Sequence, residues 1–205
     1  MPGVGADLGR VSPLPLYARG AETMGMVAPV YYTADMVRAL PEDGNRYEVV
    51  YGELLVTPAP RLWHQKVVGR LVVALDTYLQ QELVGEVVMA PADISWGRHV
   101  LVQPDVFVVP REEARTLNWA EIRTLLLAAE VLSPSSQRAD RFTKRRLYQE
   151  RSVGTYWVVD GDERVVEVWT PQTELPAIER ERLSWHPAGA GRPFTLEFAE
   201  LFRPI

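Results

Sequence analysis

Two carboxylates interrupt segments that otherwise read as buried β-strands. Asp105 lies in "VQPDVFVV" and Glu130 lies in "LLLAAEVLS". An ionised carboxylate buried without a partner is costly, so such a residue normally has a cation, a hydrogen-bond network or a metal ion beside it. For either acid alone, capping of a turn or pairing with an arginine is the simpler explanation. Two such acids at one end of a sheet could hold Mg²⁺ or Mn²⁺, which take oxygen ligands.

A metal ion held there would suit the chemistry of phosphate esters. It could activate a water molecule and offset the negative charge that develops on a phosphate. Lys144, in "RADRFTKRRLY", follows Glu130 across the turn at Pro134, and its ammonium group could orient that water or offset phosphate charge. The alternative for Lys144 is a surface ion pair with Asp140, four residues earlier on the same helix face.

Three other polar residues are supporting candidates. Glu53, in "YGEL", follows a glycine turn and could enter the same cleft as an outer ligand, or it could be an exposed hairpin acid. His64 begins a long helix and could contact phosphate or carry protons, although a capping or packing role is the alternative. Asp140 could hydrogen-bond to Lys144 or to metal-bound water.

Basic residues are concentrated after the Pro134 turn. Between Ser135 and Gly154 there are six basic and two acidic side chains, in a chain whose net charge is −5. Binding to a phosphate backbone needs such local positive charge, so Arg138, Arg141 and Arg145 are candidate contacts to DNA. A solvated helix face would have the same composition. Nothing in the sequence resembles a motif that reads bases.

The composition excludes several other kinds of site. The chain of 205 residues has no cysteine, which excludes disulfides, thiolate zinc sites and cysteine nucleophiles. Its three histidines are too few and too scattered for a zinc site. No apolar run approaches the length of a membrane span, and the N-terminus lacks the apolar core of a signal peptide, so we expect a cytoplasmic protein.

The order of predicted elements indicates an α/β (α+β) domain, with a mixed sheet flanked by helices. Residues 1–29 are rich in Gly and Pro and read as an irregular arm, and residues 30–205 as a single domain. A short helix capped by Thr33, a hairpin turning at Tyr51 and Gly52, and a long amphipathic helix from His64 are expected first. Several strands, a helix after Pro134, a hairpin in "YWVVDGDERVVEVW" and a short final helix complete the prediction.

The acids belong to a recognisable pattern. "PD" at 104–105, followed by Glu130, resembles the first two acidic positions of the PD-(D/E)XK nuclease superfamily. The strings "RYEVVYGEL", "QPDVFVV" and "EVLSPSSQRADRFTKRRLYQERSVGTYWVVD" resemble the Uma-type family of bacterial proteins with a restriction-endonuclease-like fold. Two positions depart from these patterns. Leu132 stands where the superfamily usually has its lysine, and Thr155 stands where the family commonly has Glu.

The resemblance implies roles for the candidate residues. Asp105 and Glu130 would bind the divalent metal ion, with the backbone carbonyl of Val131 as a further oxygen ligand. Lys144 would replace the lysine missing at Leu132, as in superfamily variants that move this lysine to the following helix. We therefore expect its ammonium group to approach the acids.

The leading hypothesis is a Mg²⁺- or Mn²⁺-dependent endonuclease that hydrolyses DNA phosphodiester bonds. A nuclease-fold protein that binds nucleic acid or a protein partner without cutting is the main alternative. A hydrolase with two carboxylates, such as a glycosidase, is a third, which the match around "EVLSPSS" disfavours. Since restriction-type enzymes are often dimers, we also expect a homodimer, for which the "YWVVDGDERVVEVW" hairpin could supply an interface.

Overall fold

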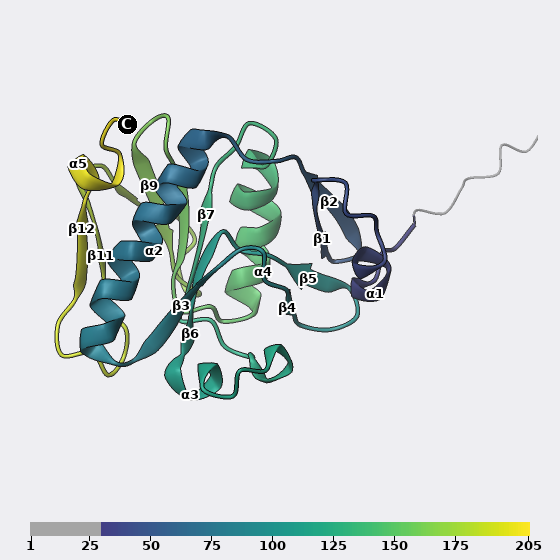
Figure 1. Cartoon of the computed structure of the whole chain (residues 1–205), viewed down its shortest axis with the longest axis horizontal. Coiled ribbons are helices and arrows are strands. Elements are labelled where there is room, and N and C mark those ends of the chain that lie inside the picture. The colour runs from purple at the N-terminus through teal and green to yellow at the C-terminus, as the bar shows by residue number, and fades with distance from the viewer. Residues whose placement is uncertain (1–29) are drawn as a thin grey trace, which may run out of the picture.

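The computed structural model describes residues 30–205, and the predicted N-terminal arm lies outside this range. Its centre is a six-stranded mixed sheet with the order β10-β9-β8-β7-β6-β3 (Figure 1). The strands are β3 (Gly85–Met89), β6 (Val106–Pro110), β7 (Leu127–Val131), β8 (Tyr156–Asp160), β9 (Val165–Trp169) and β10 (Ala177–Glu179). Only β7 and β8 pair in parallel in this sheet; its other pairs are antiparallel.

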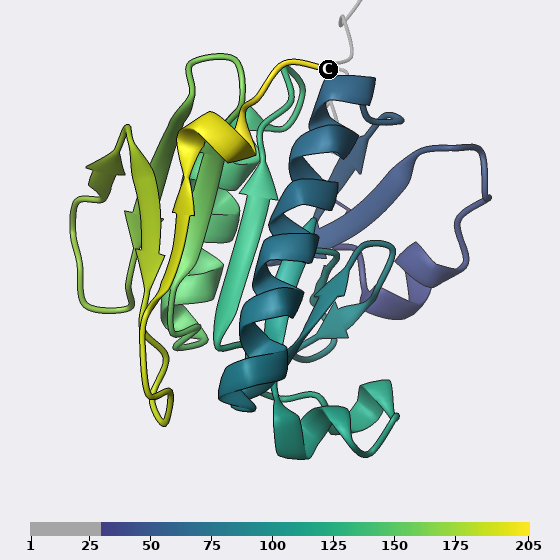
Figure 2. The same cartoon turned by 60° about the vertical axis from the view of Figure 1, so that its left-hand side comes forward.

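Helices cover both faces of the large sheet, as Figure 2 shows. On one face lie α2 (Leu62–Glu82), the hairpin of β11 (Arg182–Trp185) and β12 (Phe194–Glu197), and α5 (Phe198–Leu201). On the other face lies α4 (Arg145–Glu150), preceded by the π-helix η2 (Ala139–Lys144). Two apolar cores result, one on each face, so the predicted α+β fold with helices flanking a mixed sheet is confirmed.

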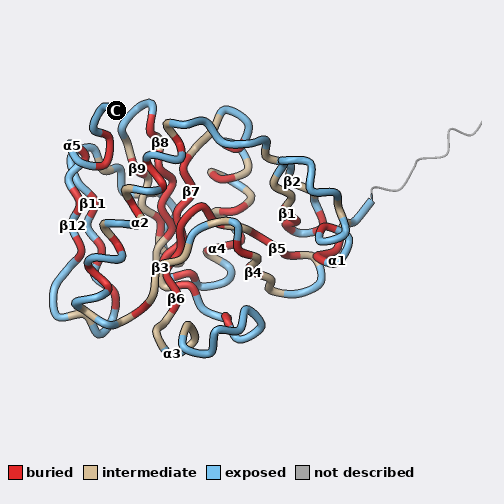
Figure 3. The backbone as a smooth tube through the Cα atoms, viewed as in Figure 1, coloured by how far each residue is buried: buried red, intermediate tan, exposed pale blue. Residues whose placement is uncertain are grey.

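A smaller antiparallel sheet, with the order β2-β1-β5-β4, packs beside α4 on the same face. Its strands are β1 (Arg46–Val50), β2 (Glu53–Thr57), β4 (Ile94–Ser95) and β5 (Val100–Val102), with α1 (Ala34–Arg38) beside them. The chain between β6 and β7 contains α3 (Arg111–Ala114) and the 3₁₀ turn η1 (Trp119–Glu121). Figure 3 shows that the buried residues concentrate in the central strands and on the inner faces of the helices.

The local predictions agree with this arrangement. The backbone N–H of Met36 donates to the Thr33 hydroxyl at 3.2 Å, which confirms the expected N-cap. The long helix begins two residues earlier than the expected His64. All five residues of β7 are buried, as expected for a strand covered on both faces. Among residues 30–205, no helix is long and apolar enough to cross a bilayer.

The hairpin proposed as a dimer interface lies inside the large sheet. It forms β8 and β9, which lie inside the large sheet between β7 and β10. Both strands therefore have their hydrogen-bonding edges filled by strands of the same chain, and the hairpin offers no free edge to a second copy. Homodimerisation itself stays a prediction.

Candidate active site

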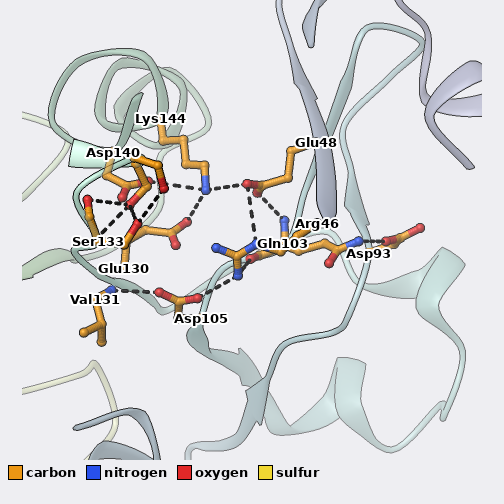
Figure 4. A network of polar contacts seen from close by, with 12 residues as sticks. Arg46, Glu48, Asp93, Gln103, Asp105, Glu130, Val131, Ser133, Asp140 and Lys144 are labelled. Atoms are coloured by element: carbon orange, nitrogen blue, oxygen red, sulfur yellow. Dashed lines mark hydrogen bonds and ion pairs between the residues drawn. The ribbon is translucent and has the colours of Figure 1, made fainter. Parts of the chain in front are cut away.

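A cluster of buried charged residues lies where the two sheets meet the π-helix (Figure 4). The parallel pairing of β7 with β8 requires a crossover, and this crossover carries η2 over the face of β7 from which Glu130 projects. Wide π-turns are frequent at functional sites, and this one buries both Asp140 and Lys144. Glu48 reaches the same place from β1 of the small sheet.

Lys144 is the centre of the cluster. Its Nζ lies 2.7 Å from Glu48 Oε2, 3.0 Å from Glu130 Oε1 and 3.4 Å from Asp140 Oδ1, and the side chain is 1% exposed. Burial disfavours the charged ammonium, but three carboxylates outweigh burial and raise its pKa. The expected approach of Lys144 to Glu130 is confirmed. Its contact with Asp140 also exists, but it is buried rather than a surface pair.

Asp105 lies just before β6, one position beyond the Val106–Ala129 pair of the sheet, and therefore beside Glu130. Its Oδ2 accepts from the backbone N–H of Val131 at 2.8 Å and lies 3.1 Å from His64 Nε2. Its Oδ1 accepts from Arg46 Nη1 at 2.6 Å. Burial opposes ionisation of Asp105, but the hydrogen bond with His64 and the charge of Arg46 prevail and lower its pKa well below the usual range.

Glu130 and Asp140 show the opposite effect, a raised pKa. Burial raises the pKa of Glu130 well above its ordinary value, because Lys144 is shared with Asp140 and Glu48, whose charges disfavour ionisation. Burial also raises the pKa of Asp140, for which Lys144 compensates only in part. Glu130 Oε1 accepts from Lys144 and from Tyr148 Oη at 3.1 Å. Within the described range, Glu130 Oε2 has no hydrogen-bond partner although it is buried.

A cleft of about 890 Å³ opens beside the cluster. The side chains that connect it to the cluster are those of Arg46, His64, Gln103 and Asp105, and the turn 133–136 forms part of the wall. Glu130 and Lys144 lie behind them and do not line the cleft. A ligand in the cleft would therefore meet Asp105, Arg46 and His64 first.

The donor chemistry of the cluster fits a hard divalent cation. Four buried carboxylates (Glu48, Asp105, Glu130, Asp140) face two buried or half-buried cations, Arg46 and Lys144, which leaves an excess of negative charge when all are ionised. The free Oε2 of Glu130 is an oxygen ligand of the kind that Mg²⁺ and Mn²⁺ prefer. As the side chains stand, residues 30–205 contain no group of three or more His, Asp or Glu arranged to hold a metal ion. Arg46 donates to Oδ1 of Asp105, while Val131 and His64 occupy Oδ2, so metal binding at Oδ1 requires Arg46 to withdraw.

Sequence reasoning missed Glu48 and Arg46. Glu48 is 1% exposed, and its Oε1 accepts from the backbone N–H of Gln103 at 2.7 Å. The sequence offered only a weak signal for Glu48, an acid in a predicted strand that polar or charged residues precede. Of the two roles left open for Glu53, the structure supports the exposed hairpin acid: Glu53 lies on β2, the edge strand of the small sheet, and does not line the cleft.

The other supporting candidates lie close to the acids. His64 is in the first turn of α2, lines the cleft and contacts Asp105. Asp140 contacts Lys144 within the cluster. Val131 contributes its N–H to Asp105, and its carbonyl as a metal ligand stays a prediction.

The expected basic patch is much reduced in the folded chain. Lys144 is buried, and Arg141 pairs with Glu167 at 2.7 Å and Asp160 at 3.2 Å. Arg145 donates to Gln149 and stacks on Trp169. Counting charges in a window of sequence missed Asp160, Glu167 and Trp169 because they lie on β8 and β9. Arg138 is exposed and, of the three arginines proposed as DNA contacts, it alone forms no side-chain hydrogen bond or ion pair within residues 30–205.

Comparisons with known proteins agree with this fold. A crystal structure of "a putative nuclease belonging to DUF820" from Anabaena variabilis superposes with a TM-score of 0.69 and 21% sequence identity, covering 83% of this chain and 97% of that chain. At this identity the likeness establishes the fold. A search of curated proteins found no match. The profile of the Uma2 family, described as "Putative restriction endonuclease", matches residues 34–193. The chain therefore belongs to the Uma2 family, whose restriction-endonuclease-like fold it shares.

Proposed function

We propose that this protein is a divalent-metal-dependent endonuclease that hydrolyses phosphodiester bonds of DNA at the cleft beside Asp105. The observation that carries the proposal is the buried cluster in which Lys144 contacts Glu130, Glu48 and Asp140 while Asp105 stands at the cleft. Membership of the Uma2 family supports a nuclease in general. Metal dependence, the DNA substrate and the roles of individual residues are part of the proposal.

Asp105 and Glu130 would hold the metal ion, with the carbonyl of Val131 as a further ligand. When bound, Mg²⁺ or Mn²⁺ would supply a polarised water and neutralise charge on the phosphate. Lys144 donates to Glu130 Oε1 and so holds this carboxylate in place, while Glu48 contacts the same ammonium group. Three carboxylates surround the ammonium group of Lys144, so it would orient the attacking water only after one of these contacts is exchanged for that water.

Arg46 and His64 stand at the cleft and would contact the substrate. Arg46 would donate to a non-bridging phosphate oxygen once it leaves Asp105, because guanidinium groups bind phosphate with two parallel hydrogen bonds. His64 is oriented by Asp105 and can hold or pass a proton at the edge of the cleft. In the reaction, a water oxygen attacks phosphorus, one P–O ester bond breaks, and the leaving oxygen takes up a proton.

A plasmid-cleavage assay with Mg²⁺ or Mn²⁺ tests the proposal. Wild type should nick supercoiled DNA, whereas Asp105→Ala and Lys144→Ala should not. Glu53→Gln is the matched control, because it removes one exposed acid that lies outside the cleft. Equal nicking by all four proteins would indicate a contaminant and reject the assignment. Parallel assays with an RNA transcript test the choice of DNA.

The alternative of a nuclease-fold protein that binds without cutting also has an observation in its favour. Arg46 donates to Oδ1 of Asp105, as a permanent substitute for a metal ion would do. This alternative predicts DNA binding without cleavage, together with no increase in thermal stability when Mg²⁺ or Mn²⁺ is added. Metal-dependent stabilisation that Glu130→Gln abolishes would exclude it.

A further inference from the structure

A second groove runs along the outer side of α2, away from the buried cluster. It has a volume of about 790 Å³, and residues of α2 and of the C-terminal segment that contains β12 and α5 line it. Figure 2 shows this segment beside α2. Gln65 lines both this groove and the cleft beside Asp105. The two hollows are therefore adjacent on the surface, and an extended ligand in one could continue into the other.

The groove is basic although the protein as a whole is acidic. Its charged lining residues are Lys66, Arg70, Arg192, Arg203 and one acid, Glu200. Arg192 is neutralised by Glu82, which lies 2.9 Å away. Lys66 and Arg203 are exposed, and no ion pair of either is present within residues 30–205. Arg61 extends the positive charge from the start of α2 into the cleft.

Two of these cations are held close together. Arg70 donates to the backbone carbonyls of Leu201 at 3.0 Å and Arg203 at 2.6 Å, and these bonds fix the C-terminal segment against α2. Burial and then the charge of Arg203 lower the pKa of Arg70, so the two guanidinium groups repel each other. A bound anion between them would relieve this repulsion.

We propose that the groove along α2 binds the phosphate backbone of the nucleic acid that flanks the scissile bond. This inference rests on the proposed nuclease function, since it makes the groove an extension of the same cleft. Helix α2 rises about 1.5 Å per residue, so Lys66 lies about 6 Å along the helix from Arg70, and both are within reach of one backbone. The groove takes over the role expected of the arginines after Pro134, of which Arg141 has its charge satisfied within the fold.

Binding of fluorescein-labelled duplex DNA, followed by anisotropy in EDTA over a range of salt concentrations, tests this proposal. The variant Lys66→Glu/Arg203→Glu should bind about tenfold or more weakly than wild type. The slope of log affinity against log salt should decrease in magnitude by about two, because two phosphate contacts are lost. Arg98→Glu/Arg180→Glu is the matched control, with the same change of charge at two exposed positions outside both hollows.

The outcomes test the groove and distinguish its failure from a failure of the proposed endonuclease activity. An unchanged salt slope in the groove variant, an equal loss in the control variant, or no DNA binding by wild type would overturn the groove assignment. Binding of polyglutamate with the same dependence on Lys66 and Arg203, in place of DNA, would overturn it in favour of an acidic protein partner. A wild type that binds DNA through the groove but cuts no plasmid in Mg²⁺ or Mn²⁺ would support the groove and reject the endonuclease.

Discussion

The Nζ atom of Lys144 lies 2.7 Å from Oε2 of Glu48, and both side chains are 1% exposed. Lys144 lies on η2, in the crossover between β7 and β8, and Glu48 lies on β1, so this ion pair joins the small sheet to the crossover of the large sheet. A buried ion pair is costly to break on one side only, because the remaining charge is left without compensation. The pair should therefore matter for folding as well as for catalysis.

Removal of the Lys144 charge should destabilise the protein. For Lys144→Met we expect a loss of about 3–5 kcal/mol in the free energy of unfolding, since three buried carboxylates lose their shared cation. Urea denaturation followed by circular dichroism measures it. Adding Glu48→Gln to Lys144→Met should recover part of this loss, because one uncompensated charge is removed. Strictly additive effects of the two substitutions would contradict a direct interaction.

The raised pKa values of Glu130 and Asp140 predict a pH dependence of stability. These folded-state pKa values lie above the unfolded value of about 4, so the folded state binds more protons, and the stability that these groups contribute falls as pH rises towards their raised pKa values. Asp105 acts oppositely, because its lowered pKa contributes stability that is lost as pH falls below about 4.

The comparison that isolates Glu130 is wild type against Glu130→Gln. Between about pH 5 and about pH 8, wild type should lose stability relative to the variant as pH rises, because Glu130 can lose its proton and Gln cannot. Urea denaturation at several pH values measures the difference. Wild type gaining stability relative to Glu130→Gln as pH rises would show that Glu130 ionises at its ordinary pKa.

The parts of the fold that the sequence predicted depend on local patterns. Thr33 caps α1, and the apolar spacing after His64 defines α2, because neighbours in sequence determine these features. Asp105 and Glu130 were recognisable because each interrupts an apolar strand. Glu48 lacked that contrast, since polar or charged residues precede it in "NRYE", and its burial follows from packing of the small sheet against the crossover.

The predictions of exposed positive charge were less accurate, because residues distant in the sequence can neutralise a basic side chain. Arg141 counted as positive in a window of sequence, but Asp160 and Glu167, on neighbouring strands, satisfy it. The basic groove along α2 combines Lys66 with Arg203, which are far apart in the sequence, so no local window could contain both. Pairings of this kind require the tertiary structure.

Arg46 should compete with metal ions for Asp105. Its guanidinium lies 2.6 Å from Oδ1 of Asp105, so a cation can reach this oxygen only after Arg46 moves. Arg46→Gln should therefore bind Mn²⁺ several-fold more tightly than wild type in isothermal titration calorimetry. DNA cleavage by the same variant should fall, because the phosphate loses a bidentate donor. Weaker Mn²⁺ binding by Arg46→Gln would instead indicate that Arg46 supports the ligand geometry.

Tyr148 donates a hydrogen bond to Glu130, and Tyr148→Phe removes this bond while keeping the aromatic ring. Its hydroxyl donates to Glu130 Oε1 at 3.1 Å, and its ring is fully buried. Tyr148→Phe should lower the free energy of unfolding by about 1 kcal/mol, since a buried hydrogen bond is lost. It should also raise the pKa of Glu130 further, because the lost donor stabilised the ionised form.

If Glu130 must be ionised to bind metal, the rise of cleavage activity with pH shifts to higher pH in this variant. Tyr32→Phe, at a tyrosine remote from Glu130, should leave that profile in place. An unshifted profile for Tyr148→Phe would separate Glu130 ionisation from the rate of cleavage.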